Sequence, residues 1–164
     1  LTIMHYSPIL LKLMGIEIAS ELIASNHHCA EQRLWRHVLL NAFEDTRITQ
    51  SDRKSSIYKM EAHEWIVNEN EDFEWICWQC GWEPTHVKEQ YFKAVRKGVV
   101  TFNHRQIKWL QYYKLYQDLK KEKDSVKRLS LRKKVEATRR AVFETTTALV
   151  QRFIIEQNLL VANG

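Results

Sequence analysis

Residues that break regular structure are scarce in this chain. Its 164 residues include only 4 glycines and 2 prolines, which argues against a turn-rich β fold and favours helices. A Gly-rich loop of the kind that cradles phosphates is also missing. Apolar residues still make up 45% of the chain and include 18 aromatic side chains, enough for a hydrophobic core. The sequence therefore predicts an all-α fold.

Long apolar runs are missing as well. The most apolar stretch, residues 9–24, is interrupted by Lys12, Glu17 and Glu21, and it is too short and too charged to span a bilayer. We therefore expect no membrane partner. The three cysteines are an odd number, which fits a reducing compartment better than a framework of disulfides. This favours a cytoplasmic protein.

Charge is distributed unevenly along the chain. Residues 1–83 contain 7 Lys/Arg and 13 Asp/Glu, a net charge of −6. Residues 84–140 contain 17 Lys/Arg and 5 Asp/Glu, a net charge of +12. A face that binds a polyanion segregates charge in this way, although a solvated basic hairpin would do the same. The charge pattern favours nucleic-acid contact by the second half of the chain.

Apolar side chains recur at helical spacing over most of the sequence. The pattern predicts helices over about residues 8–24, 30–47, 53–67, 73–80, 84–97, 103–123 and 126–161. In the helix over residues 53–67, the side chains expected to face the core are Tyr58, Ala62, Trp65 and Ile66. The last helix has a stripe that steps by three or four residues, which suits a hairpin or coiled coil. A homodimer through these long helices is also consistent with that stripe.

Cap residues mark several of these helix ends. Asp72 is an expected N-cap, and either Thr101 or Asn103 is expected to cap the helix that runs to about residue 123, because a short polar side chain accepts from free backbone N–H groups. Asp124 and Ser125 are expected to form a turn and cap before the last helix, Pro84 suits a first helical position, and Gly98 is placed to end a helix. We expect a helical bundle over residues 1–98 and a long basic helical hairpin over residues 99–164.

The segment around Gly81 has the spacing of a helix-turn-helix. Ile76 and Cys77 give the first helix two consecutive inward residues, and Cys80 can pack against the second helix. Glycine takes the positive φ that the tight turn needs without steric cost. Trp82 is placed to fill the corner. The segment over residues 73–98 is therefore a candidate DNA-binding motif, and a purely structural helix pair is the alternative.

The second helix of this motif would bury Val87, Tyr91, Ala94 and Val95 and leave its other face for a major groove. In such motifs the N-terminal half of the helix reads base edges, and basic residues hold phosphates. The residues predicted to read base edges in the groove are Thr85, Lys88 and Glu89, and His86 is a further predicted DNA-binding residue on the same free face. The predicted phosphate contacts are Lys93, Arg96, Lys97 and Arg105, followed in the basic hairpin by Lys127, Arg128, Arg132, Lys133 and Lys134.

Metal and catalytic chemistry are weaker interpretations. Cys77 and Cys80 form half of a zinc site, whose other ligands would have to come from His63, His86 or Cys29. Their i, i+3 spacing on an inward face favours core packing, so we expect no metal and no cofactor. The acidic residues that a metal-dependent nuclease would need are Glu61, Glu64, Glu69, Glu71, Asp72 and Glu74. They alternate with core positions and fit a solvated face, and no set of nucleophile, base and orienting group is evident, so we expect no enzyme.

Several short patterns resemble a known group of proteins. They are LWRHVLL at 34–40, FED at 43–45, AHEWI at 62–66 and DF at 72–73, followed by Cys77, Gly81, Pro84 and Val87. With these the chain resembles small phage and alphaproteobacterial proteins, part of which are similar to the activators of gene transfer agents. The resemblance covers about residues 33–97. It implies a transcription regulator that binds double-stranded promoter DNA and RNA polymerase.

A protein-interaction module is the main alternative. Trp75 and Trp78 would occupy positions that are often exposed on the first helix of the motif. They must then pack on another helix or on a partner, such as RNA polymerase or a phage component. The function therefore stays open between a DNA reader, a docking module and a nucleic-acid-processing enzyme.

Overall fold

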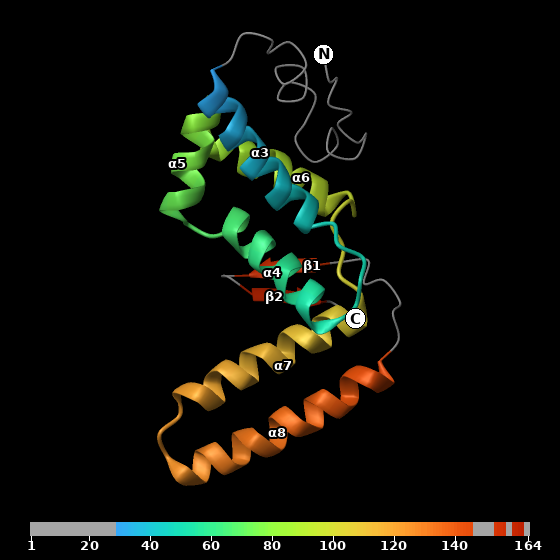
Figure 1. The fold of residues 1–164 in the computed structure, drawn as a ribbon. Coiled ribbons are helices and arrows are strands. Elements are labelled where there is room, and N and C mark those ends of the chain that lie inside the picture. The colour runs from blue at the N-terminus through green and yellow to red at the C-terminus, as the bar shows by residue number, and fades with distance from the viewer. Residues whose placement is uncertain (1–28, 146–152, 157–158, 163–164) are drawn as a thin grey trace.

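The computed structural model describes residues 29–145, 153–156 and 159–162, and the predicted helix over residues 8–24 lies outside them. Six helices follow one another in this part of the chain (Figure 1). They are α3 Ala30–Asp45, α4 Arg53–Val67, α5 Glu71–Cys80, α6 Pro84–Arg96, α7 His104–Lys121 and α8 Ser125–Glu144. The body of the protein is helical, which confirms the all-α prediction for residues 29–145. None of the described helices is long and apolar enough to cross a bilayer.

Most helix boundaries lie where local sequence signals put them. Asn103 caps α7, and its side chain and that of Gln106 form a reciprocal capping box. Asp124 caps α8 by accepting from two backbone N–H groups, and Pro84 is the first residue of α6. The predicted cap Asp72 is wrong. Asn70 caps α5 instead, because its side-chain oxygen accepts from the N–H groups of the two residues that follow Glu71.

The prediction that the last helix continues to residue 161 is also wrong. Helix α8 ends at Glu144, and Thr145 is extended with φ −81° and ψ 134°. Residues Phe153–Glu156 and Leu159–Ala162 then form strands β1 and β2, which pair antiparallel with Ile154 opposite Val161. No glycine or proline stands at the end of α8, and the helical spacing of apolar residues continues beyond Glu144. The sequence therefore predicted a helix that is too long.

The main core joins α3, α5 and α6 with α4 and the segment before α7. Its buried residues include Leu39, Phe43, Phe73 and Tyr91, and the rings of Phe43 and Tyr91 lie 5.7 Å apart. The same core contains Phe102, so it extends on both sides of residue 98. The division into two domains at that residue stays a prediction.

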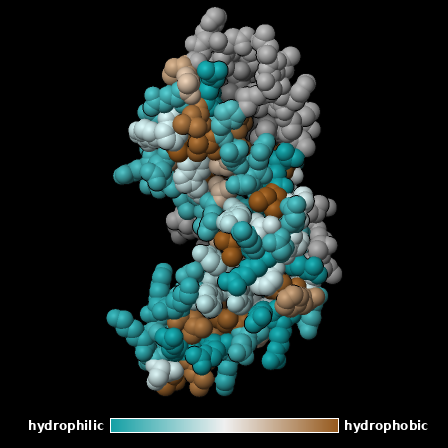
Figure 2. Space-filling model, viewed as in Figure 1, coloured by the Kyte–Doolittle hydropathy of each residue, from teal (hydrophilic) through white to brown (hydrophobic). Residues whose placement is uncertain are grey.

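A second, smaller core lies between α7 and α8, which run side by side in Figure 1. It contains Trp109 and Tyr112 from α7 and Val135 and Val142 from α8. Figure 2 shows hydrophilic residues over most of the visible face, with separate hydrophobic patches near α3 and α5 and between α7 and α8. Trp109 and Tyr112 of α7 therefore contribute to the packing of these two helices.

Helix α4 turns a different face inward from the one predicted. Its buried residues are Ser56, Lys59, His63 and Ile66. Of the residues expected in the core, only Ile66 is fully buried; Tyr58 is 48% exposed, and Ala62 and Trp65 are half-buried. The polar face can be buried because it finds hydrogen-bond partners: the Nζ of Lys59 donates to the backbone oxygens of Ile48 and Thr101.

Candidate nucleic-acid interface

The junction between α5 and α6 is a tight corner. Gly81 has φ +80°, the left-handed conformation predicted for it. The backbone N–H of Trp82 donates to the oxygen of Cys77 over 2.9 Å, and the Trp82 side chain is only 3% exposed. Helix α3 fixes the corner from outside, because Gln32 and the Nε of Arg36 both donate to the oxygen of Cys80. The geometry of the turn therefore agrees with the sequence-based expectation.

Helix α6 buries the face that its spacing predicted. Pro84, Val87, Tyr91 and Ala94 are buried, and Val95 is half-buried. The predicted contact residues exposed on its other side are Thr85, Glu89, Lys93, Arg96 and Lys97. His86 is half-buried and already takes part in an interaction. The free part of α6 thus has more cations near its C-terminal end than near its N-terminal end.

Lys88 lies differently from the other predicted contacts. Its Nζ donates to the backbone oxygen of Asn68 over 2.8 Å, and it lies 5.4 Å from the centre of the Phe73 ring. Asn68 is the C-cap of α4, where backbone carbonyls lack helical partners. In this structure Lys88 therefore stabilises the junction between α4 and α5 and does not extend away from the protein.

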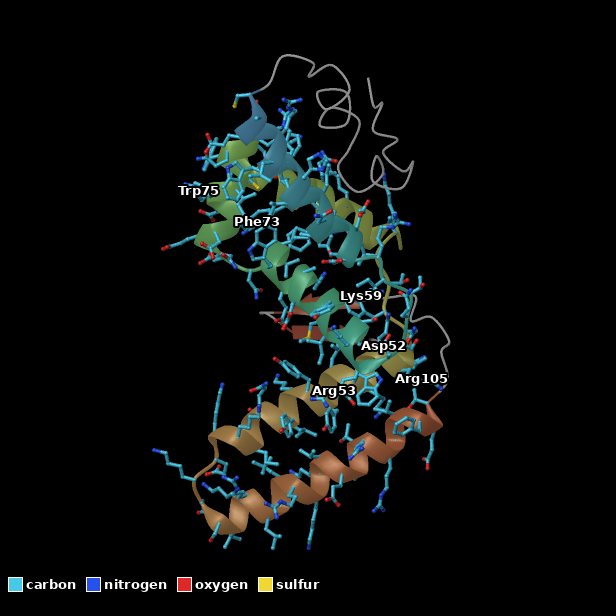
Figure 3. All side chains as sticks on the ribbon, viewed as in Figure 1. Asp52, Arg53, Lys59, Phe73, Trp75 and Arg105 are labelled. Atoms are coloured by element: carbon cyan, nitrogen blue, oxygen red, sulfur yellow. The ribbon has the colours of Figure 1, made fainter. Side chains whose placement is uncertain are left out.

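Arg105 is also engaged within the protein. It is half-buried at the start of α7, and its Nε donates to the oxygen of Thr145 over 3.3 Å. Figure 3 shows Arg105 near the start of α7, close to the end of α8. This cation satisfies a carbonyl at a helix end, where positive charge is favoured by the helix dipole.

Helix α8 has the densest array of exposed cations. Lys127, Arg128, Arg132, Lys133 and Lys134 are all exposed, as a contact surface requires. The sequence-based interpretation missed two further exposed residues of the same helix, Arg139 and Arg140. The signal for them was present, since they continue the same basic run one to two turns further on. With only Glu136 and Glu144 as acidic residues, α8 has seven Lys/Arg and a net charge of +5.

The cations of α6 and α8 lie on different parts of the molecule. Helix α6 lies beside α3 and α5, whereas α8 lies against α7 at the other end of the fold (Figure 1). The segment with net charge +12 in the sequence therefore does not form one surface: α6 has part of the exposed cations, and α7, α8 and the loop between them have the rest. Of α6 and α8, α8 is the more strongly charged.

The two cysteines of the motif are core residues, as predicted. Cys77 and Cys80 are fully buried free thiols. Burial raises the pKa of each thiol to about 12, so both are protonated and unreactive at neutral pH. Within the described residues no three His, Cys, Asp or Glu side chains are grouped as metal ligands.

Large apolar side chains are exposed on the outer side of α5. Trp75 is 49% and Trp78 is 61% exposed. Trp75 packs edge-on against Trp35 of α3, with 4.8 Å between ring centroids. Leu34, at the same end of α3, is 57% exposed. Monomeric proteins seldom expose several large apolar side chains together without a partner.

Comparisons of the chain with protein-family models, with curated proteins and with solved structures found no match.

Proposed function

We propose that this protein is a non-enzymatic regulator of transcription that binds duplex DNA. The observation that carries the proposal is the set of seven exposed Lys and Arg side chains on the twenty residues of α8. Duplex DNA presents one negative charge per about 1.7 Å of its axis. A helix of twenty residues is about 30 Å long, so α8 can contact several phosphates along its length. The resemblance to activators of gene transfer agents favours the same activity.

In this proposal α5 and α6 act as a helix-turn-helix, and α7 and α8 as a basic hairpin. The α6 side chains available for base edges are Thr85 and Glu89, and those available for phosphates are Lys93, Arg96 and Lys97. Because only Thr85 and Glu89 are available for base edges, α6 can read few base pairs. Phosphate contacts by α8 therefore supply most of the affinity, and α6 supplies a smaller contribution to specificity.

The proposal is tested by measuring fluorescence anisotropy of a labelled promoter duplex over a range of salt concentrations. Binding should weaken steeply with salt, because Lys and Arg release counterions from the phosphates. The double variant Lys133→Glu, Lys134→Glu should bind at least tenfold more weakly at low salt and show a smaller salt dependence. A protein that does not bind the duplex at low salt is not a DNA-binding regulator.

A matched control variant distinguishes the effect of where the cations lie from the effect of the total net charge. The double variant Arg33→Glu, Lys54→Glu changes the net charge by the same amount, and both residues are exposed on the first half of the fold. Its affinity should stay much closer to that of the unchanged protein. Equal losses in the two variants would show that only the total charge matters, and would exclude α8 as the binding surface.

A homodimer through the long helices is part of the same proposal. Val126 and Leu129 are exposed on α8, at 77% and 55%, which leaves apolar side chains for a second copy. Light scattering with and without duplex distinguishes a pre-formed dimer from a monomer. A monomer in both conditions excludes the dimer and leaves the DNA proposal unaffected.

The second candidate function is docking on another protein, such as RNA polymerase or a phage component. It is favoured by the exposure of Trp75 and Trp78 on α5. The double variant Trp75→Ser, Trp78→Ser should lose binding to purified RNA polymerase and keep binding to DNA. The α8 variant should show the reverse pattern if the two surfaces have separate partners.

A further inference from the structure

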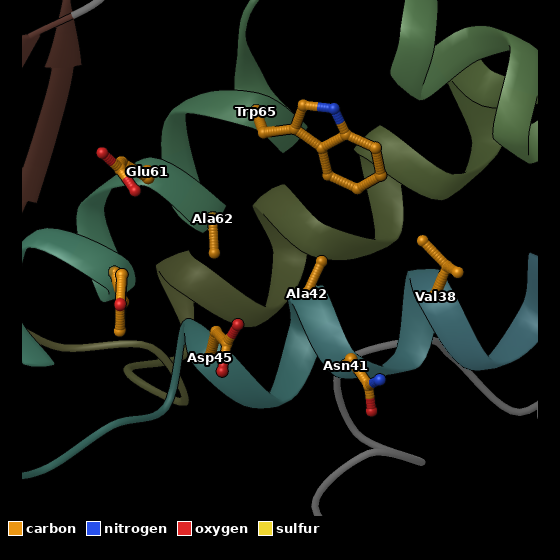
Figure 4. Close-up of a pocket in the computed structure, with 8 residues that line it drawn as sticks. Val38, Asn41, Ala42, Asp45, Glu61, Ala62 and Trp65 are labelled. Carbon is orange, nitrogen blue, oxygen red and sulfur yellow. The ribbon is translucent and has the colours of Figure 1, made fainter.

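A groove of about 410 Å³ lies between α3 and α4 (Figure 4). Val38 of α3 and Trp65 of α4 lie toward one end of it, and Asp45 and Glu61 lie toward the other. Partial burial raises the pKa of the Asp45 carboxyl, so its charged form would be stabilised by a cation placed beside it. The groove is thus apolar at one end and suited to a cation at the other.

The apolar end of the groove is open because α4 turns other residues into the core. Lys59 and His63 of α4 are buried, whereas Ala62 and Trp65 line the groove. An apolar groove between two helices is a surface that an amphipathic helix covers. The occupant of this groove should have apolar side chains near one end of its face and Lys or Arg near the other.

Helix α8 has a face of this kind. Val126, Leu129 and Lys133 follow i, i+3 and i+7, and all three are exposed. This spacing places them on the side of the helix opposite Val135, which is buried in the core between α7 and α8. The outward face of α8 is therefore apolar near the start of the helix and basic about two turns further on.

The groove and this face of α8 match in length. Val38 and Asp45 are seven residues apart on α3, which is about 10 Å of helix. Val126 and Lys133 are also seven residues apart on α8. We propose that α8 of a second copy lies in the α3–α4 groove, parallel to α3. Val126 then lies beside Val38, and Lys133 lies beside Asp45. The reverse direction would place Lys133 at the apolar end, so charge complementarity selects the parallel arrangement.

The contact must join two copies of the protein. Within one molecule α8 packs against α7, and α7 packs against α4. Helix α7 therefore lies between α8 and α4 (Figure 1), and the outward face of α8 points away from the groove of its own chain. Arg132 and Lys134 point about 100° to either side of Lys133, so they can still contact phosphates when a second copy covers the outward face.

The α8 contact rests on the homodimer proposed above and identifies the surface of the second copy that receives the helix. If the protein forms no dimer, both proposals fail, whereas a dimer that pairs α8 with α8 contradicts the groove contact alone. Lys133 also belongs to the predicted DNA surface, so the tests measure association in the absence of DNA.

Disulfide trapping between two variants of the full chain tests the register. In a Cys29→Ser background the two remaining native thiols are buried. One protein carries Asn41→Cys in the groove and the other carries Ser130→Cys on α8, and both positions are exposed. Mild oxidation of an equal mixture should give mainly the disulfide between the two different proteins. A mixture of Ser130→Cys with Glu74→Cys, at an exposed position on α5, should give little. If two Ser130→Cys chains pair preferentially, the groove contact is wrong; if no mixture forms a disulfide, the dimer is wrong as well.

A charge exchange provides a second test, in which sedimentation velocity measures the fraction of dimer and circular dichroism checks that each variant keeps its helices. Asp45→Lys should lower the fraction of dimer several-fold, because it places a second cation beside Lys133. Adding Lys133→Glu to the same chain should restore the dimer. Glu44→Lys makes the same change in net charge at an exposed position outside the groove, and should have little effect. Equal effects of Asp45→Lys and Glu44→Lys, or no restoration by Lys133→Glu, would overturn the proposal.

Discussion

The Nδ1 of His63 and the hydroxyl oxygen of Tyr91 are hydrogen-bonded over 2.7 Å in the middle of the core. The bond joins α4 to α6, and the His63 side chain is only 2% exposed. Burial, together with the nearby charge of Lys59, lowers the pKa of His63 to about 4. The folded protein therefore holds this imidazole neutral over a pH range in which the unfolded chain protonates it.

The first prediction concerns acid stability. Between pH 6.5 and 4 the unfolded chain binds more protons at His63 than the folded protein, so stability should fall as the pH falls through this window. The contribution is roughly 3 kcal/mol. His63→Gln should lack this part of the pH dependence, since glutamine does not titrate. Urea unfolding at several pH values measures the difference, and the exposed variant His104→Gln should behave like the unchanged protein.

The second prediction concerns the buried ammonium group of Lys59. Lys59→Met removes hydrogen bonds to the oxygens of Ile48 and Thr101 and to Gln106, and should destabilise the protein by about 2 kcal/mol at pH 7. The exposed variant Lys54→Met should have almost no effect. Thermal or urea unfolding of the two variants decides whether Lys59 stabilises the fold.

The contribution of Lys59 to stability should also depend on pH. Burial lowers its pKa to about 8, so between pH 8 and about 10.5 the unfolded chain binds more protons at this residue. Stability of the unchanged protein, measured relative to Lys59→Met, should rise with pH across this window. A constant difference would mean that the ammonium group has its ordinary pKa in the fold.

The third prediction compares two glycines with the same backbone conformation. Gly81 and Gly98 have φ of +80° and +76°, so alanine at either position costs about 1 kcal/mol of backbone strain. At Gly81 the added methyl group would also come within 2.9 Å of the Gln32 Nε2, whereas nothing lies within 4 Å at Gly98. Displacing Gln32 breaks its hydrogen bond to Cys80, which adds about 1 kcal/mol.

Chemical denaturation of Gly81→Ala and Gly98→Ala measures this difference. In a Gln32→Ala background the two glycine substitutions should become nearly equal, because the displaced amide is no longer there. If Gly81→Ala is as mild as Gly98→Ala in the unchanged background, the contact with Gln32 does not stabilise the corner.

The fourth prediction separates two lysines of α6. Lys88 donates to the oxygen of Asn68, whereas Lys93 is exposed. Lys88→Met should lower the free energy of unfolding by about 1 kcal/mol and leave DNA affinity nearly unchanged. Lys93→Met should do the opposite, weakening binding with little effect on stability. Loss of DNA affinity in Lys88→Met, at unchanged stability, would return this lysine to the binding surface.

Local features of the sequence predicted much of the fold. The turn at Gly81 and the turn and cap at Asp124 and Ser125 lie where they were expected, and Asn103 is one of the two caps expected for α7. Each of these features depends on residues within three or four positions. The error at Asp72 was also local: Asn70 is an equally good cap two residues earlier. The left-handed conformation of Gly81 and the buried face of α6 follow from such short-range patterns.

The sequence did not predict the features that depend on contacts between residues far apart in the chain. The polar face of α4 is buried because Lys59 donates to the backbone oxygen of Ile48, eleven residues away, and to the side chain of Gln106 in α7. Gln106 in turn donates to the oxygen of Ile48, fifty-eight residues away from it in the chain. Nothing near Lys59 in the sequence indicates this. The same limit applies to the candidate site, since the hydrogen bonds that engage Lys88 and Arg105 lie twenty and forty residues away.

The loop between α3 and α4 is held by side chains from other elements. The backbone oxygen of Ile48 accepts from Lys59 and Gln106, that of Gln50 from Gln106, and that of Ser51 from the indole of Trp109. The loop therefore cannot be released without breaking contacts to α4 and to the start of α7. Its amides and those at the start of α7 should exchange with solvent deuterium together, as one cooperative unit that opens in a single step.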